Sequence, residues 1–153
     1  MPSIMIVDDD DLAAEQTSNI LIEAGLPCGW LTDPIEALGR MRWRRPDLLL
    51  LDHDMPQLTG REMLREMRRS PELYDLPVIM LTAMQGEHDE HSARHAGAQD
   101  YIRKPFDARY LLMKVRRQLD ARAHRPQHRT LDEIMQPDKL RPTMTPPQRR
   151  SVC

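Results

Sequence analysis

Short apolar runs that each end in a polar residue recur along the first two thirds of the chain. Such a run is typical of a strand in a parallel sheet, because these strands are buried on both faces. A further short strand is predicted at Gly29–Leu31. The four clearest runs, with the polar residues behind them, are Ile4–Val7 with Asp8 and Asp9, Leu48–Leu51 with Asp52, Val78–Leu81 with Thr82, and Tyr101–Arg103 with Lys104.

Segments with polar and apolar residues at helical spacing separate these strands. Asp11 before the first helix, and Asp33 with Pro34 before the second, are capping signals. Strand and helix alternate five times, which predicts an α/β fold with a doubly wound, five-stranded parallel sheet and five helices in three layers. The predicted helices are Leu12–Ala24, Pro34 to about Trp43, Arg61–Arg69, Glu87–His95, and a last helix capped by Asp107 that runs to Leu119.

The composition changes after residue 119, which divides the chain into a domain over 1–119 and a tail over 120–153. The tail holds five prolines, and its seven basic and four acidic residues give it a charge of +3, against −5 for residues 1–119. We expect such a segment to be extended or disordered. Thr130 and Glu133 match a capping box, so a short helix near 130–136 is one interpretation and a local fluctuation the other.

Bulk properties exclude several classes of protein. A net charge of −2 gives no general attraction to nucleic acid, so no direct binding to it is predicted. Cys28 and Cys153 are too few for a disulfide framework. Because the chain has neither a membrane-length apolar run nor a signal peptide, we expect a soluble protein in the reducing cytoplasm.

Acidic residues follow two strands that the topology places at one edge of the sheet. Asp8, Asp9 and Asp52 are expected to meet there, because ligands of open α/β sheets bind beyond the carboxyl ends of the strands. Two carboxylates about 4 Å apart repel by about 4 kcal/mol at an effective dielectric near 20. Mg²⁺ would relieve that repulsion, with the backbone carbonyl of Asp54 as a further protein ligand.

The same edge is predicted to suit phosphoryl chemistry. One oxygen of Asp52 would remain free to attack phosphorus, as carboxylate nucleophiles do when they form acyl phosphates. Lys104 can hold a phosphoryl oxygen as a point charge, and the Thr82 hydroxyl can donate to another. The residues therefore predict a site for a divalent metal ion and a phosphoryl group.

Together these motifs resemble the response-regulator receiver domain of two-component signalling. The separations are 43 residues from Asp9 to Asp52, 30 from Asp52 to Thr82 and 22 from Thr82 to Lys104, and they also suit that family. The resemblance covers about residues 3–119 and implies a flavodoxin-like fold. The motifs that carry it are Val7–Asp9, Leu51–Pro56 with Gly60, Leu81–Ala83 and Gly97–Phe106.

The resemblance implies a role for each residue of the site. Asp52 would accept a phosphoryl group from a histidine kinase or phosphotransfer protein, and Asp8 and Asp9 would serve Mg²⁺. Lys104 would contact the phosphate, and its bond to Pro105 would be cis. The chain would then be a signalling switch that catalyses only its own phosphorylation and dephosphorylation.

The resemblance also implies how the signal leaves the site. Thr82 would move toward the phosphoryl group, Ala83 would leave room for that group, and Tyr101 would turn inward. These motions would change the surface of the fourth helix, the fifth strand and the last helix, which would contact a downstream protein. A homodimer of the phosphorylated form is a further expectation.

Three alternatives stay open at this point. Asp52-His53-Asp54 resembles the Asp-x-Asp motif of haloacid-dehalogenase-like, Mg²⁺-dependent phosphatases, although that motif lies on the first strand of those proteins. The chain is otherwise the N-terminal receiver of a longer regulator, or a receiver-like module that binds a partner without phosphorylation. Taken alone, Asp8 could merely cap the first helix.

Other polar features have plainer interpretations. By resemblance, Asp54 and Met84 are expected to set the lifetime of the phosphoryl group, in a direction that the residues do not give. His88, His91 and His95 share one face of the predicted fourth helix. This face is either a metal or pH-sensitive site or a solvated polar surface, and we favour the solvated surface. We expect Arg40, Arg42, Arg44 and Arg45 to form a basic surface.

Overall fold

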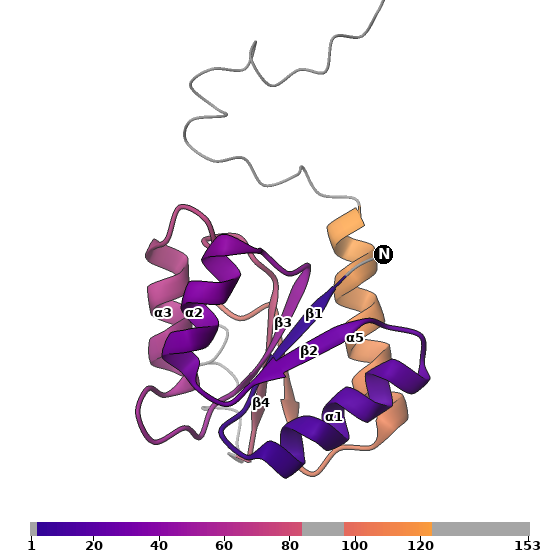
Figure 1. Ribbon diagram of the computed structural model, residues 1–153. Coiled ribbons are helices and arrows are strands. Elements are labelled where there is room, and N and C mark those ends of the chain that lie inside the picture. Colours follow the sequence, from indigo (N-terminus) through magenta and orange to yellow (C-terminus); the bar gives the residue numbers. More distant parts are fainter. Residues whose placement is uncertain (1–2, 84–96, 124–153) are drawn as a thin grey trace, which may run out of the picture.

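The computed structural model describes residues 3–83 and 97–123, which form a single sheet covered by helices (Figure 1). All strand pairs are parallel, in the order β2-β1-β3-β4-β5. The elements are β1 (Ile4–Val7), α1 (Asp11–Glu23), β2 (Cys28–Leu31), α2 (Pro34–Trp43), β3 (Leu48–Asp52), α3 (Gly60–Arg69), β4 (Val78–Thr82), β5 (Asp100–Arg103) and α5 (Ala108–Ala123).

The predicted doubly wound parallel sheet is confirmed. All five strands lie in one sheet, and the described residues contain four of the five predicted helices. The predicted helix Glu87–His95 lies outside the described residues, and so do Met84 and the tail beyond residue 123. Within the described part of the chain, no helix is both long enough and apolar enough to cross a membrane.

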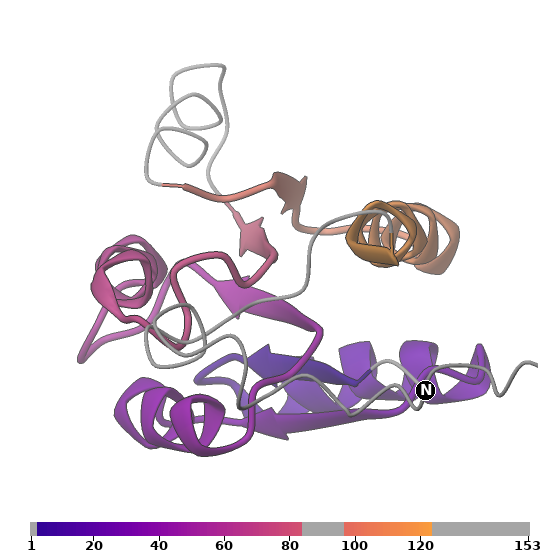
Figure 2. The same cartoon turned by 90° about the horizontal axis from the view of Figure 1, so that it is seen from above.

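The helices cover the sheet on both faces. Seen from above, α1 and α5 lie on one face, and α2 and α3 lie on the other (Figure 2). Successive strand residues therefore point into two different cores: Leu49 and Leu51 pack toward α2 and α3, whereas Leu48 and Leu50 pack toward α1 and α5. The central strands β1, β3 and β4 are largely apolar because both of their faces are covered.

One predicted helix cap is wrong. The N-cap of α1 is Asp10 rather than Asp11, and its carboxylate accepts hydrogen bonds from the amides of Leu12 and Ala13 at 3.0 and 3.4 Å. Asp10 has extended backbone angles, whereas Asp11 is already the first helical residue. Because acids occupy both positions, composition alone does not distinguish them.

The predicted caps of α2 and α5 are confirmed. Asp33 caps α2, with Pro34 at its first position. The Asp107 carboxylate accepts a hydrogen bond from the Tyr110 amide at 2.7 Å, and α5 then continues to Ala123, beyond residue 119.

Two arginine side chains form hydrogen bonds with loops at the amino-terminal end of the sheet. Arg45 was predicted to be part of a basic surface, but it is half-buried, forms an ion pair with Asp75 at 2.9 Å and donates to the carbonyl of Glu72 at 2.8 Å. Arg68 on α3 contacts a larger set of oxygens. Its guanidinium donates to the carbonyls of Leu73, Tyr74, Leu76 and Gly97 and to the side-chain oxygen of Gln99, at 2.7 to 3.2 Å.

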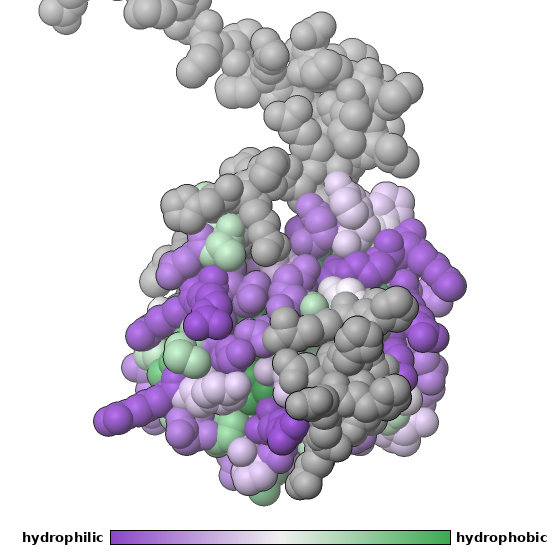
Figure 3. Space-filling model, turned by 180° about the vertical axis from the view of Figure 1, so that it is seen from behind, coloured by the Kyte–Doolittle hydropathy of each residue, from purple (hydrophilic) through white to green (hydrophobic). Residues whose placement is uncertain are grey.

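One face of the molecule is mostly polar. In the view of Figure 3 it is largely hydrophilic, with smaller hydrophobic areas between the polar residues. Trp43, at the end of α2, is the most exposed of the large hydrophobic residues recorded, at 88%. Arg40, Arg42 and Arg44 are exposed around it, as the sequence predicted.

Candidate functional site

Three carboxylates meet at the carboxyl ends of two neighbouring strands. Asp8 and Asp9 follow β1, Asp52 ends β3, and these strands pair in the sheet. One oxygen from each carboxylate lies within 4.8 Å of the others. Asp8 and Asp52 are buried, whereas Asp9 is exposed. The structure therefore brings together the three acids that the sequence placed at this edge.

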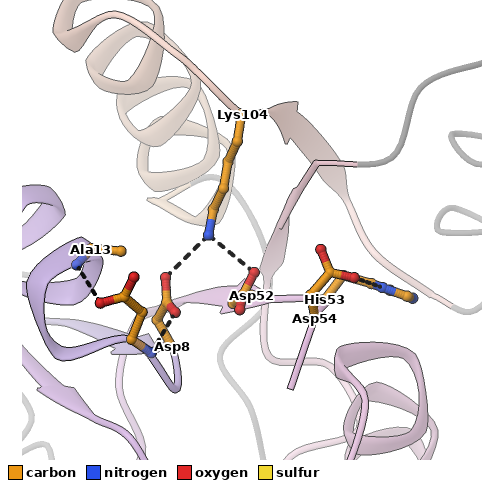
Figure 4. A network of polar contacts seen from close by, with 7 residues as sticks. Asp8, Ala13, Asp52, His53, Asp54 and Lys104 are labelled. Carbon is orange, nitrogen blue, oxygen red and sulfur yellow. Dashed lines mark hydrogen bonds and ion pairs between the residues drawn. The ribbon is translucent and has the colours of Figure 1, made fainter. Parts of the chain in front are cut away.

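Lys104 reaches the same point from the other side of the sheet (Figure 4). Its ammonium nitrogen lies 3.1 Å from Asp52 Oδ1 and 3.2 Å from Asp8 Oδ2. Its own amide donates to the carbonyl of Thr82 at 2.8 Å, and its peptide bond to Pro105 is cis. Lys104 is thus placed by the end of β5 to bridge the two buried acids.

The buried charges shift the protonation of the site. Burial raises the pKa of the Asp52 carboxyl from 3.8 to about 6, and the negative charge of Asp8 adds to the rise. Lys104 and a hydrogen bond from the backbone of Asp54 act in the opposite direction but do not cancel it. Burial lowers the pKa of Lys104, but the carboxylates of Asp52 and Asp8 outweigh this effect and raise it above 10.5.

The site has more negative charge than its own cation can balance. Three ionised carboxylates around one ammonium leave a charge of −2, which is the charge that one divalent cation would neutralise. The donors are all oxygens and lie close enough for a single ion to reach directly or through its own waters. This donor set therefore fits Mg²⁺.

The loop after β3 approaches the site through its backbone. The amide of Gly60 donates to the carbonyl of His53 at 3.0 Å. A Cβ atom at Gly60 would lie 2.5 Å from the Asp52 carbonyl oxygen and 2.9 Å from both the His53 Cα and the Met80 Sδ. Only glycine allows this close approach, so Gly60 fixes the start of α3 against the end of β3.

Asp54 lies beside the site but its side chain has another partner. The carboxylate is 57% exposed and lies 3.3 Å from the His53 ring nitrogen Nδ1. The His53 side chain is only 12% exposed. The Asp54 side chain is thus engaged outside the acidic cluster, and a metal-binding role for its backbone carbonyl stays a prediction.

The other predicted site residues lie along β4 and β5. Thr82 is buried at the end of β4, beside the strand that carries Asp52, and Ala83 is exposed directly after it. Tyr101 is half-buried on β5, where it packs against the core and lines an open groove of about 550 Å³ together with Phe106 and Tyr110. Thr82 lies at the carboxyl end of β4, whereas Tyr101 packs against the core on the side of the sheet that α2 and α3 cover.

An open cleft beside Asp9 was not predicted. It has a volume of about 260 Å³ and gives the exposed acid access to solvent. The sequence analysis assigned Asp33 and Pro34 only a capping role, and the contribution of the β2–α2 and β3–α3 loops depends on the fold. The lining residues are Asp9, Thr32, Asp33, Pro34, Pro56 and Gln57.

The fold and the site together define a small α/β protein with an acidic, oxygen-rich centre at the carboxyl edge of its sheet. Residues 4–116 match the family model of the response regulator receiver domain. The chain belongs to this family, whose members are signalling proteins of two-component systems.

Known proteins agree with this assignment. The chain is 34% identical over 135 residues to the DNA-binding dual master transcriptional regulator RpaA of Synechocystis sp., covering 88% of this chain and 56% of that protein. It is 36% identical over 114 residues to the phosphate regulon transcriptional regulatory protein PhoB of Pseudomonas aeruginosa, covering 74% of this chain and 50% of that protein. The chain therefore spans about half the length of the curated relatives it matches.

A solved structure shows the same fold at a similar level of identity. The signal receiver domain of a signal transduction histidine kinase from Syntrophus aciditrophicus is 32% identical, with a TM-score of 0.75. The match covers 86% of this chain and 98% of that domain. The receiver fold assigned from the family model is thus found independently in the coordinates.

Proposed function

We propose that Asp52 accepts a phosphoryl group from the phosphohistidine of a sensor kinase or phosphotransfer protein in the cytoplasm. The observation that carries this proposal is the position of the Asp52 carboxylate, which is buried, 3.1 Å from Lys104 and within 4.8 Å of two further acids. Asp8, Asp9, Asp52 and the Asp54 carbonyl would hold Mg²⁺. The ion would supply charge neutralisation while the site is loaded.

The proposed transfer needs only groups of this chain and the donor. A carboxylate oxygen of Asp52 forms a bond to phosphorus while the bond from phosphorus to the donor's histidine nitrogen breaks, and the electron pair leaves with that nitrogen. Lys104 already lies at the Asp52 carboxylate, so its ammonium can move onto a phosphoryl oxygen without crossing the site.

The phosphoryl group would act on the rest of the molecule through β4 and β5. It adds close to two negative charges and strong acceptors beside the buried Thr82. We propose that the Thr82 hydroxyl turns toward it past the small Ala83, and that Tyr101 fills the space that Thr82 leaves. Such a motion would change the surface formed by the fourth helix, β5 and α5, which we assign to a downstream protein or to a homodimer of the phosphorylated form.

The phosphatase alternative is less well supported. In that mechanism the second acid of Asp52-His53-Asp54 would donate a proton at the reaction centre. Here the Asp54 carboxylate is largely exposed and engaged with His53. The acidic pair also follows the first strand, and a helix–strand–helix segment separates it from the third strand, which Asp52 ends. These positions favour an acceptor of phosphoryl groups over a hydrolase of phosphate esters.

The direct test is labelling with a small donor. After incubation with acetyl phosphate and Mg²⁺, intact mass is expected to show one added phosphoryl group on the parent chain and none on Asp52→Asn. Asp54→Asn is the matched control, because it removes a neighbouring carboxylate and should still be labelled. Labelling that survives Asp52→Asn, or turnover of phosphate esters without labelling, would contradict the proposal.

A further inference from the structure

The outward face of α5 carries an open groove that the proposed switch does not use. The helix turns Leu111, Val115 and Gln118 toward the interior, where all three are buried. Its opposite side borders a groove of about 670 Å³. The groove is lined by Arg109, Leu112, Met113, Arg116, Arg117 and Asp120.

The groove combines an apolar strip with positive charge. Leu112 and Met113 lie next to each other, and Met113 is 47% exposed, which is a large fraction for a methionine. Three arginines and one aspartate line it, so the groove has a net charge of +2 on a domain whose first 119 residues sum to −5. An occupant with apolar side chains and acidic neighbours would match both properties.

The chain itself contains such a segment. Residues 130–136 carry the apolar side chains Leu131, Ile134 and Met135, and between them the acids Asp132 and Glu133. The three apolar residues are spaced so that they would share one side of a helical turn. The segment is thus complementary to the groove in apolar character and opposite to it in charge.

The length of the connection allows the segment to reach the groove. The six residues 124–129 separate it from the end of α5, and six extended residues span about 20 Å. Met113 lies ten residues before Ala123, which corresponds to about 15 Å along a helix. The connection also falls within the usual lengths between packed antiparallel helices. Tethering at this length gives the segment a high effective concentration at the groove.

We propose that residues 130–136 of this chain bind in the groove on the outer face of α5. Leu131, Ile134 and Met135 then cover Leu112 and Met113. The acids of the segment pair with the arginines at the rim. This contact places the tail beside the surface that the receiver is proposed to use for output, but its formation does not depend on phosphorylation of the site.

A disulfide trap tests the position of the segment. In the full-length chain with Cys28→Ser and Cys153→Ser, the pair Met113→Cys and Ile134→Cys is expected to cross-link within one chain at least tenfold faster than the control pair Gln16→Cys and Ile134→Cys. Gln16 is exposed on α1 and does not line the groove. Equal rates for the two pairs would overturn the proposal. A disulfide that joins two chains would overturn it as well, since it would assign the groove to a second copy.

A charge exchange tests the chemistry of the contact in the same trap. Arg116→Glu with Arg117→Glu should slow the cross-link about tenfold, and adding Asp132→Arg with Glu133→Arg should restore it. Arg65→Glu, on the exposed side of α3, is the control and should leave the rate unchanged. Failure of the exchanged charges to restore the rate would contradict the pairing. Neither measurement requires phosphoryl transfer. A negative result would therefore contradict the proposed contact of the tail without contradicting the proposed function.

Discussion

The two ends of the sheet hold buried charge in opposite ways. At the amino-terminal end, one guanidinium, that of Arg68, donates to five neutral oxygen acceptors around it. At the carboxyl-terminal end, the ammonium of Lys104 pairs with Asp8 and Asp52, and the carboxylate of Asp9 lies beside them. Oxygen atoms of the protein accept hydrogen bonds from the charged guanidinium at the first end. At the second end, the negative charge of the carboxylates exceeds the positive charge of Lys104.

The amino-terminal end of the sheet therefore contributes to stability, whereas the carboxyl-terminal end is suited to binding. Burial lowers the pKa of Arg68 to about 10, which still leaves it charged at neutral pH, and the surrounding carbonyls then hold α3, the loop after it and the start of β5 together. At the other end, burial and repulsion raise the pKa of Asp52. An unbalanced buried charge costs folding free energy and is the property that lets a site bind a cation.

Replacing Arg68 should give the largest loss of stability. Arg68→Leu removes the guanidinium that donates to the part-buried carbonyls of Leu76 and Gly97, and we expect the free energy of unfolding to fall by about 4 kcal/mol. Urea unfolding measures it. Arg65→Leu on the same helix is the control, since Arg65 is exposed and its loss should change stability by less than about 0.5 kcal/mol. Equal effects of the two substitutions would remove the contrast between the ends of the sheet.

Replacing Asp52 should raise the free energy of unfolding rather than lower it. Unfolded Asp52 loses its proton near its ordinary pKa of 3.8 and folded Asp52 near about 6, so between these values the folded state binds more protons and rising pH favours unfolding. This difference corresponds to about 3 kcal/mol. Without divalent cations, Asp52→Asn should therefore be more stable than the parent by about 3 kcal/mol near pH 7 and about equally stable near pH 4.

Chemical unfolding at both pH values checks this prediction. Asp54→Asn is the control, because its carboxylate is 57% exposed and its loss should change the stability much less than the loss of the buried Asp52. If Asp52→Asn were less stable than the parent near neutral pH, the carboxylate would be a stabilising group, and the site would resemble the opposite end of the sheet.

A second pair of the same residue types sharpens the comparison. Lys114 on α5 lies 3.0 Å from the buried Asp100 on β5. Lys114→Met should destabilise the protein by about 2 kcal/mol, because it removes this cation from a buried carboxylate. Adding Asp100→Asn should recover part of the loss in thermal unfolding, and a fully additive double variant would show that the pair is not coupled.

The layered fold follows from the sequence because its signals are local. Leu48–Leu51 is apolar without interruption since both faces of its strand are covered, and Asp33 with Pro34 marks a helix start through two adjacent residues. The choice between Asp10 and Asp11 as a cap depends on backbone angles, which neighbouring acids do not reveal. Elements are therefore predicted more reliably than their exact ends.

The sequence predicted only part of the site. Asp8, Asp9 and Asp52 were placed together because parallel strands end at one edge. The structural role of Arg68 was not accessible, because its acceptors Leu76 and Gly97 lie 8 and 29 residues away and meet it only through the topology. Long-range contacts of one polar side chain leave no periodic trace in a sequence.

Binding of Mg²⁺ tests the central claim most directly, which is that the acidic cluster is completed by a divalent cation. In titration calorimetry at neutral pH the parent should bind one Mg²⁺, and the ion should raise the free energy of unfolding. Asp9→Asn should abolish both effects, whereas the neighbouring Asp10→Asn, which keeps a good N-cap for α1, should preserve them. Equal binding by both variants, or no binding by the parent, would contradict the account.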